Sequence, residues 1–142
     1  MGDESQAPLP RLFGLCSAKF SEQLLHALWD AGFTDQRAVY DRVFPFVPPE
    51  GIRLTALADR AGMTKQAMSE LVGDLVSMGY LQRSPDPADG RAKLIAFTDR
   101  GWAAVETVLA SFRDVEASLL GRLGERRMRE LRRTLMELLD DA

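Results

Sequence analysis

Apolar residues recur at steps of three and four along several stretches of the chain, which is the spacing of one face of an α-helix. The first stretch predicts a helix over residues 11–31, ended by Gly32, with an apolar face of Leu12, Leu15, Cys16, Phe20, Leu24, Ala27 and Leu28. Thr34 suits the N-cap of a second helix, since its hydroxyl can accept a bond from a free backbone N–H. That helix would end at Pro45, before a Pro- and Gly-containing loop, and would bury Ala38, Val39 and Val43.

Residues 54–81, LTALADRAGMTKQAMSELVGDLVSMGYL, predict two short helices joined by a tight turn. Thr55 is the expected cap of the first helix, Gly62 allows the sharp turn, and Thr64 caps the second helix. The second helix is expected to run to about residue 78, where Gly79 closes it, and to bury Met68, Leu71, Val72 and Leu75. Two short helices with a glycine in the turn make a helix-turn-helix.

The exposed face of that second helix begins with slim polar side chains. Lys65, Gln66 and Ser69 lie near its N-terminus, beside the Thr64 cap. Amide and hydroxyl groups of this kind can bond to base edges in the major groove of DNA, and a helix N-terminus favours phosphate. We therefore interpret this face as a DNA-reading surface. Acidic residues further along the same helix suit DNA less well, so a helix pair that merely packs is the alternative.

A β-hairpin is predicted directly after the helix-turn-helix, in QRSPDPADGRAKLIAFTDRG, residues 82–101. Strands near residues 80–84 and 92–97 would flank a long polar tip, whose prolines and glycine suit turns. Arg91 at the tip can enter the minor groove or bind a phosphate, and Asp89 can fix it through an ion pair. Arg83 and Lys93 add positive charge. A helix-turn-helix followed by a hairpin is a winged helix; a solvated charged loop that contributes little energy is the alternative.

Two further apolar stripes follow the hairpin. One predicts a helix of about six turns from Trp102 to Gly124, through Val105, Val108, Phe112, Val115, Leu119 and Leu123. The other predicts a last helix through Met128, Leu131, Leu135, Leu138 and Leu139. The remaining faces of that helix carry alternating charges, which is typical of a solvated, ion-paired surface: Arg126, Arg127, Arg129, Arg132 and Arg133 with Glu125, Glu130 and Glu137. One winged helix cannot cover both stripes, so a dimerisation layer is expected, although an intrachain bundle would use the same stripes.

The predicted fold is mainly α with a small β-hairpin wing (α+β), a winged helix-turn-helix between N- and C-terminal dimerisation helices. We expect a flexible lead-in over residues 1–10 and N-terminal helices over residues 11–50. A DNA-binding lobe would cover residues 51–100, and dimerisation helices residues 101–142. The length of 142 residues fits one domain with such an extension.

Composition and charge restrict the setting. The chain is 46% hydrophobic and 27% charged, which is ordinary for a soluble globular protein. No apolar run approaches the ~20 residues of a membrane span, and the polar start MGDESQAPLP does not resemble a secretory signal. With a single cysteine, these features predict a cytoplasmic protein. The net charge of −3 means that DNA binding must rest on local charge, here four cations against Asp86 and Asp89.

Enzymatic function is not expected, because the sequence contains no Gly-rich phosphate loop, no HExxH and no nucleophile elbow. The stronger rival is a winged helix that binds protein instead of DNA. The cations Lys65, Arg83, Arg91 and Lys93 favour DNA.

The chain resembles the MarR family of transcriptional regulators. The family's wing signature is Asp-x-Arg, five residues, then Leu-Thr; here Asp89-Gly90-Arg91 is followed by five residues and Phe97-Thr98. The run Leu54-Thr55-x-Leu57-Ala58 and the start of the second helix, Thr64-Lys65-Gln66-x-x-Ser69, also match. The resemblance implies a homodimer that binds a pseudopalindromic operator, usually as a repressor, with an affinity that a small effector changes.

Members of this family hold ligands between the dimerisation helices and the DNA-binding lobe. In this sequence five aromatic residues cluster near the expected junction: Trp29, Phe33, Tyr40, Phe44 and Phe46. Aromatic side chains with a few polar tips suit a planar ligand such as an aromatic carboxylate. The alternative is that these rings fill the hydrophobic core.

Cys16 and His26 are the single cysteine and histidine of the chain. Some MarR-like proteins sense peroxide through a cysteine in this region with tyrosine hydroxyls nearby, and Tyr40 is the one candidate partner. A buried structural cysteine is the preferred interpretation, and thiol-based sensing is the alternative. No metal site or cofactor is expected, since one cysteine and one histidine far apart would need carboxylates as most of the ligands.

Overall fold

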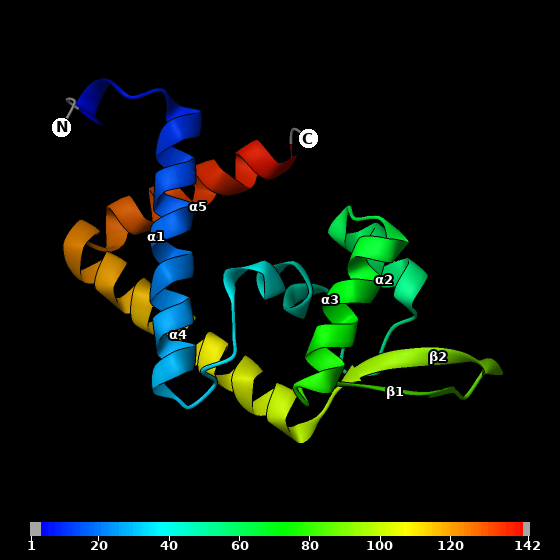
Figure 1. Cartoon of the computed structure of the whole chain (residues 1–142). Coiled ribbons are helices and arrows are strands. Elements are labelled where there is room, and N and C mark those ends of the chain that lie inside the picture. The colour runs from blue at the N-terminus through cyan, green and yellow to red at the C-terminus, as the bar shows by residue number, and fades with distance from the viewer. Residues whose placement is uncertain (1–3, 141–142) are drawn as a thin grey trace. The chain divides into compact units, whose positions relative to one another are not determined.

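The computed structural model describes residues 4–140, which are mainly helical with a two-stranded antiparallel hairpin, so the predicted fold class is confirmed (Figure 1). Contacts divide the chain into two units, one ending at Val108 and the other beginning at Leu109. In chain order the elements are η1 (Glu4–Gln6), α1 (Leu9–Asp30), η2 (Ala38–Arg42), η3 (Phe44–Phe46), α2 (Leu54–Ala61), α3 (Lys65–Ser77), β1 (Leu81–Asp86), β2 (Asp89–Phe97), α4 (Asp99–Leu123) and α5 (Glu125–Asp140).

The first long helix agrees with its apolar pattern. α1 spans Leu9–Asp30, close to the predicted 11–31, and Gly32 follows with φ of 99°, a left-handed backbone that favours glycine. Of its residues only Leu28 is buried, so Cys16 is exposed and the expectation of a buried cysteine is wrong. The predicted lead-in, residues 1–10, contains η1 and the start of α1, and residues 1–3 lie outside the described part of the chain.

The second predicted α-helix is wrong. Residues 38–46 form two short 3₁₀ segments instead, and Arg37, not Thr34, precedes η2. Pro45 supplies the physical reason: it has no N–H to donate, and it disfavours the α conformation at the residue before it. The tighter 3₁₀ turns still bury Tyr40 and Val43, whereas Val39 is exposed.

The helix-turn-helix has the predicted order. Gly62 ends α2 in the left-handed region, with φ of 63°, and the Thr64 hydroxyl caps α3 by accepting a 3.1 Å bond from the Ala67 N–H. The expected Thr55 cap of α2 is wrong. α2 begins one residue earlier, at Leu54, behind an extended Arg53, so Thr55 lies in the first turn.

The hairpin is longer and its tip shorter than the sequence suggested. β1 and β2 pair from Leu81–Phe97 to Asp86–Asp89, which leaves Pro87 and Ala88 as the turn. The prediction of a long charged tip is therefore wrong, because the charged residues after Ala88 already belong to β2. On the other side of β2, Ile52 pairs with Ile95 through backbone bonds of 2.8 and 2.9 Å, which ties the segment before α2 to the sheet.

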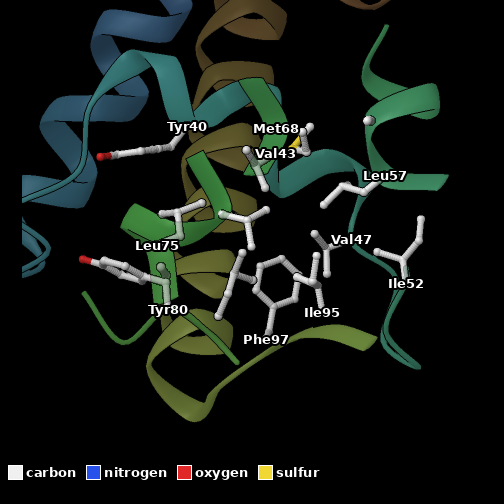
Figure 2. Close-up of a cluster of buried hydrophobic side chains, with 14 of the residues drawn as sticks. Tyr40, Val43, Val47, Ile52, Leu57, Met68, Leu75, Tyr80, Ile95 and Phe97 are labelled. Carbon is white, nitrogen blue, oxygen red and sulfur yellow. The ribbon is translucent and has the colours of Figure 1, made fainter. Parts of the chain in front are cut away.

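The core of the first unit lies between α3, the hairpin base and the segment before α2. In Figure 2, Ile95 and Phe97 of β2 point toward the side of α3 that carries Met68 and Leu75. The predicted buried face of α3 is confirmed: Met68, Val72 and Leu75 are fully buried, and Leu71 packs against them partly exposed.

The second unit comprises the end of α4 and α5. Gly124, with φ of 78°, separates the two helices, as predicted. The predicted charge pairing on α5 is also confirmed, by Arg126–Glu130, Arg129–Glu125 and Arg133–Glu137 contacts of 3.7–3.9 Å. Such exposed pairs contribute little stability. None of the residues of Glu125–Asp140 is buried, and Met128 is half-buried, so the apolar face of α5 is covered only in part within the unit.

Candidate nucleic-acid interface

The N-terminal half of α3 presents the predicted polar side chains together. Lys65 and Gln66 are exposed and Ser69 is half-buried. With Leu54 and Glu70 they line a shallow hollow of about 540 Å³ on the protein surface. An amide and a hydroxyl at the wall of such a hollow can donate and accept hydrogen bonds, which is what base edges in a major groove require. α3 also begins at this hollow, and a helix N-terminus suits phosphate.

The acidic residues of α3 differ in their surroundings. Glu70 lines the same hollow as Gln66, so it restricts anions to the N-terminal end. Asp74 lies close to the buried Tyr40: burial, and next the Asp74 carboxylate, raise the pKa of the Tyr40 phenol. Asp74 therefore faces the loop after α1 and leaves the first turns of α3 as the part suited to DNA.

The cations of the hairpin are exposed along both strands. Arg83 lies on β1, and Arg91 and Lys93 lie on β2. Asp89 contacts Arg91 differently from the prediction: its Oδ1 accepts a 3.1 Å bond from the Arg91 backbone N–H. No ion pair joins these two side chains within residues 4–140, so the Arg91 guanidinium is available to a phosphate or a groove.

Sequence reasoning missed Arg53. Its guanidinium contacts the Asp86 carboxylate at 2.7 and 2.8 Å, through Nη2 and Nε. The Ala88 N–H donates to the other oxygen of Asp86 at 2.9 Å. This bond and the Arg53 guanidinium lower the pKa of the Asp86 carboxyl. The two residues are 33 positions apart, so no local spacing could have paired them.

A second polar cluster, also missed, lies at the base of the hairpin. The Tyr80 hydroxyl donates to Asp35 at 2.5 Å, and Arg100 donates to both Asp35 and the Tyr80 oxygen at 3.0–3.3 Å. The Arg100 guanidinium also lies 4.5 Å from the centre of the Tyr80 ring. The cluster connects the loop after α1 with the ends of α3 and α4. Its signal is long-range, because Asp35 is 45 and 65 residues from its partners.

The five predicted effector residues do not line the hollow at α3. They are also absent from a second surface hollow at the base of the hairpin, which is lined by Gly79, Gln82, Phe97, Thr98, Asp99, Arg100 and Trp102. Tyr40 belongs to the core, and Phe33, Phe44 and Phe46 pack against it. Phe33 and Phe44 share the Tyr80 ring, at centroid distances of 6.0 and 6.1 Å. Trp29 stands apart, half-exposed, with its Nε1–H donating to the Gln36 carbonyl at 2.9 Å. This packing favours the core interpretation, and the pocket stays a prediction.

Among residues 4–140 no group of three or more His, Cys, Asp or Glu side chains could hold a metal ion. In the same part of the chain, no helix is both long enough and apolar enough to cross a bilayer.

Comparison with known proteins points to one family. A sequence model described as MarR family matches residues 47–92. The chain is 30% identical to the HTH-type transcriptional repressor Rv2887 of Mycobacterium tuberculosis (strain ATCC 25618 / H37Rv), over 99% of this chain and 100% of the relative. It is 27% identical to the transcriptional regulator HosA of Escherichia coli O111:H-, over 81% of this chain and 79% of HosA.

Solved structures show the same fold. The reduced form of MarR from E. coli matches with a TM-score of 0.75 and 24% identity, over 93% of this chain and 96% of that one. The S. aureus MepR–DNA complex matches with a TM-score of 0.75 and 20% identity, over 96% and 100% of the two chains.

Proposed function

Because this chain belongs to the MarR family of DNA-binding transcriptional regulators, we propose that it represses transcription by binding a pseudopalindromic operator as a homodimer, and that a small aromatic ligand releases it. Its sequence relatives are regulators, so the protein is not an enzyme. Repression is supported by the relative named a transcriptional repressor, and a DNA partner by the related fold solved in complex with DNA.

The observation that carries this proposal is the exposed polar start of α3 followed directly by a cationic hairpin. Lys65, Arg83, Arg91 and Lys93 are all exposed, and the charge of Asp86 is neutralised by Arg53. A winged helix that binds protein has no need of exposed cations on both of these elements. Duplex DNA needs them, because counterion release supplies most of its affinity.

The homodimer is supported by uncovered apolar side chains in the single chain. α1 exposes Leu9, Phe13, Leu15 and Phe20, and the second unit exposes Leu109, Phe112, Leu120, Leu131, Leu135, Met136, Leu138 and Leu139. Apolar patches of this extent mark an interface in most proteins of this size. A second copy of the chain supplies an equally apolar surface to cover these side chains. A dimer also presents two copies of α3, the proposed recognition helix, to the two half-sites of an operator.

Two measurements on the same protein test DNA binding and assembly. Footprinting on the DNA upstream of the protein's own gene is expected to show two adjacent protected half-sites. Sedimentation at micromolar concentration is expected to give about twice the chain mass of 15.8 kDa. If the protein protects DNA but sediments with the mass of a single chain, the palindromic dimer is contradicted. If no duplex is protected even at low salt, DNA binding itself is contradicted.

Arg91→Ala is expected to weaken operator binding without changing the fold or the dimer, because Arg91 is exposed and its guanidinium has no partner among the described residues. Loss of one phosphate contact should also make the salt dependence shallower by about one unit. A salt series of binding isotherms measures both effects. Arg127→Ala on α5 is a charge-matched control that should leave DNA binding unchanged. Equal affinity of the Arg91 variant and the wild type would show that the hairpin does not contact DNA.

Gln66→Ala is expected to narrow the gap between operator and random duplex by about 1–3 kcal/mol, the usual loss for a bidentate base contact. Its position at the hollow on the first turn of α3 is the reason. Competition binding with both duplexes gives the gap directly. A loss of the same size on every sequence would instead assign Gln66 to the DNA backbone.

The ligand is proposed from the aromatic residues after α1. A ligand changes DNA affinity tenfold if it binds one arrangement of the protein ~1.4 kcal/mol better than the other. We expect a planar aromatic carboxylate, with salicylate as the first trial, to quench tryptophan fluorescence and release DNA, and Trp29→Ala and Tyr40→Phe to reduce this release. If no compound of a broad aromatic panel quenches the tryptophan fluorescence or releases DNA, the pocket proposal fails. Oxidation of the exposed Cys16 then becomes the trigger to test.

A further inference from the structure

The hairpin tip is tied to the helix-turn-helix through one carboxylate. Asp86 ends β1, and its two oxygens contact different parts of the lobe. Oδ1 accepts from the Ala88 N–H at 2.9 Å, which shapes the turn, and Oδ2 lies 2.7 and 2.8 Å from the guanidinium nitrogens of Arg53. Arg53 is the residue that precedes α2. The Asp86 side chain is 12% exposed, so the pair is shielded from solvent on its acidic side.

The register of the hairpin changes at this same residue. Pro85 lies opposite Lys93, and Asp86 lies opposite Asp89. One step along β1 therefore corresponds to four steps along β2, so Gly90, Arg91 and Ala92 have no direct partners on β1. Irregularities of this kind redirect side chains and are fixed by specific local contacts. Here the backbone of Arg91 is held by Asp89, and the neighbouring strand end by Asp86 and Arg53.

Electrostatics alone does not explain an acidic residue at this end of the hairpin. Because Asp86 neutralises Arg53, replacing the carboxylate by a neutral residue would free a positive charge beside the hairpin, and on charge alone DNA binding should then strengthen. A carboxylate that fixes the geometry of the hairpin has the opposite effect when it is lost, because a mobile tip must be ordered when DNA binds. The two roles therefore predict changes of opposite sign.

We propose that Asp86 and Arg53 form a positioning pair, which holds the irregular end of the hairpin against α2 and so presents Arg91 to DNA. The inference rests on the proposed DNA-binding function. Neither residue needs to contact DNA: Asp86 acts on the turn, and Arg53 acts on Asp86. The distance between the α3 surface and Arg91 is then set by the start of α2, the element that leads into the recognition helix.

The test is a double-mutant cycle on duplex binding with Asp86→Ala, Arg53→Ala and the double variant. Asp86→Ala is expected to weaken operator binding about tenfold, although it removes a negative charge. The double variant is expected to bind no more weakly than Arg53→Ala alone, because the pair is already lost. Asp59→Ala is the matched control: Asp59 is an exposed carboxylate on α2, and its removal should leave binding unchanged or slightly tighter. The proposal would be overturned if Asp86→Ala bound the operator as tightly as the wild type or more tightly. It would also be overturned if the fold-loss of affinity in the double variant equalled the product of the two single losses.

Hydrogen exchange in the free protein supplies a readout that does not depend on DNA. The Ala88 and Arg91 N–H groups donate to Asp86 and Asp89, not to Arg53, yet Arg53→Ala is expected to accelerate exchange of both amides by about tenfold, with unchanged exchange in the core of α3. Unchanged protection at the tip would refute the positioning pair. If the wild type binds no duplex while the tip amides respond as expected, the DNA-binding function fails and the positioning contact stands.

Discussion

Replacement of Gly101 by alanine is expected to lower the free energy of unfolding by about 3 kcal/mol and the melting temperature by about 6–12 °C. Gly101 lies in the first turn of α4 and is buried. A Cβ atom there would lie 2.1 Å from the Tyr80 carbonyl oxygen and 3.0 Å from a ring carbon of Phe97. The nearest atom belongs to the backbone, so no side-chain rotation can relieve the overlap.

Two hydrogen bonds through Thr98 hold the backbone around Gly101 in place. Its N–H donates to the Thr98 hydroxyl at 3.1 Å, and the Thr98 N–H donates to the same Tyr80 oxygen at 3.1 Å. Moving the helix away would break these bonds, which join α4 to the end of α3 and the start of β1. Because α3 and the hairpin carry the proposed DNA contacts, the variant should also lose operator affinity.

Gly121→Ala in the same helix is the matched control. A Cβ atom at Gly121 meets nothing within 4 Å, so only the helix propensity changes, and the free energy of unfolding should rise by about 0.5–1 kcal/mol. Thermal and denaturant unfolding of both variants gives the comparison. Equal stability of the Gly101 variant and the wild type would refute the close approach of α4 to Tyr80.

Patterns within a single element were predicted well from the sequence. The ends of α1 and α4 follow from Gly32 and Gly124, since glycine adopts the left-handed backbone that closes a helix at no steric cost. The Thr64 cap and the buried face of α3 likewise depend on residues three or four positions apart. These signals are local, so one sequence contains them in full.

The errors arose where distant contacts or turn chemistry decide the outcome. The short apolar stretch before Pro45 predicts an α-helix, but the proline and the packing of Tyr40 and Val43 favour tighter turns. The prolines of the hairpin suggest a loop and so predict a long tip. Pro85 instead lies on β1, which pairs on one side only and so tolerates a residue without an N–H.

The candidate site divides in the same way. Gln66 and Ser69 share a hollow because they lie on one turn-spaced face of α3, which the sequence shows. The partners of Asp86 and Tyr80 are 33 and 45 residues away, and their side chains meet only after the hairpin has folded against α2 and the loop after α1. Such pairs carry no local pattern, so the contacts that position the DNA-binding elements were the part that the sequence could not predict.

Tyr80 is expected to be the most sensitive of these positions. Its ring is fully buried, contacts Phe33 and Phe44, and lies under the Arg100 guanidinium. Figure 2 shows its hydroxyl on the same side of the core as that of Tyr40. Tyr80→Ala should lower the free energy of unfolding by about 3–5 kcal/mol, the range for a large aromatic truncation. Tyr80→Phe keeps the ring and removes the hydroxyl, so it should lose about 1–2 kcal/mol through the hydrogen bonds that the hydroxyl makes with Asp35 and Arg100.

The same residue gives the protein an alkaline limit. Burial, and next the hydrogen bond to Asp35, raise the pKa of the Tyr80 phenol above its ordinary value of about 10. A raised pKa in the folded state means that the neutral phenol stabilises the fold. That contribution is complete below about pH 10 and is lost as the pH rises through the folded-state pKa.

Tyr80 and Tyr40 are the two tyrosines of the chain, so absorbance at 295 nm follows their ionisation while circular dichroism follows unfolding. In the wild type, the Tyr80 phenol should ionise at a higher pH than an ordinary tyrosine, and its ionisation should coincide with unfolding. Tyr80→Phe should lose less of its stability between pH 9 and 12 than the wild type does. If the wild type ionises both tyrosines near pH 10 and remains folded, the contact of Tyr80 with Asp35 does not contribute to stability.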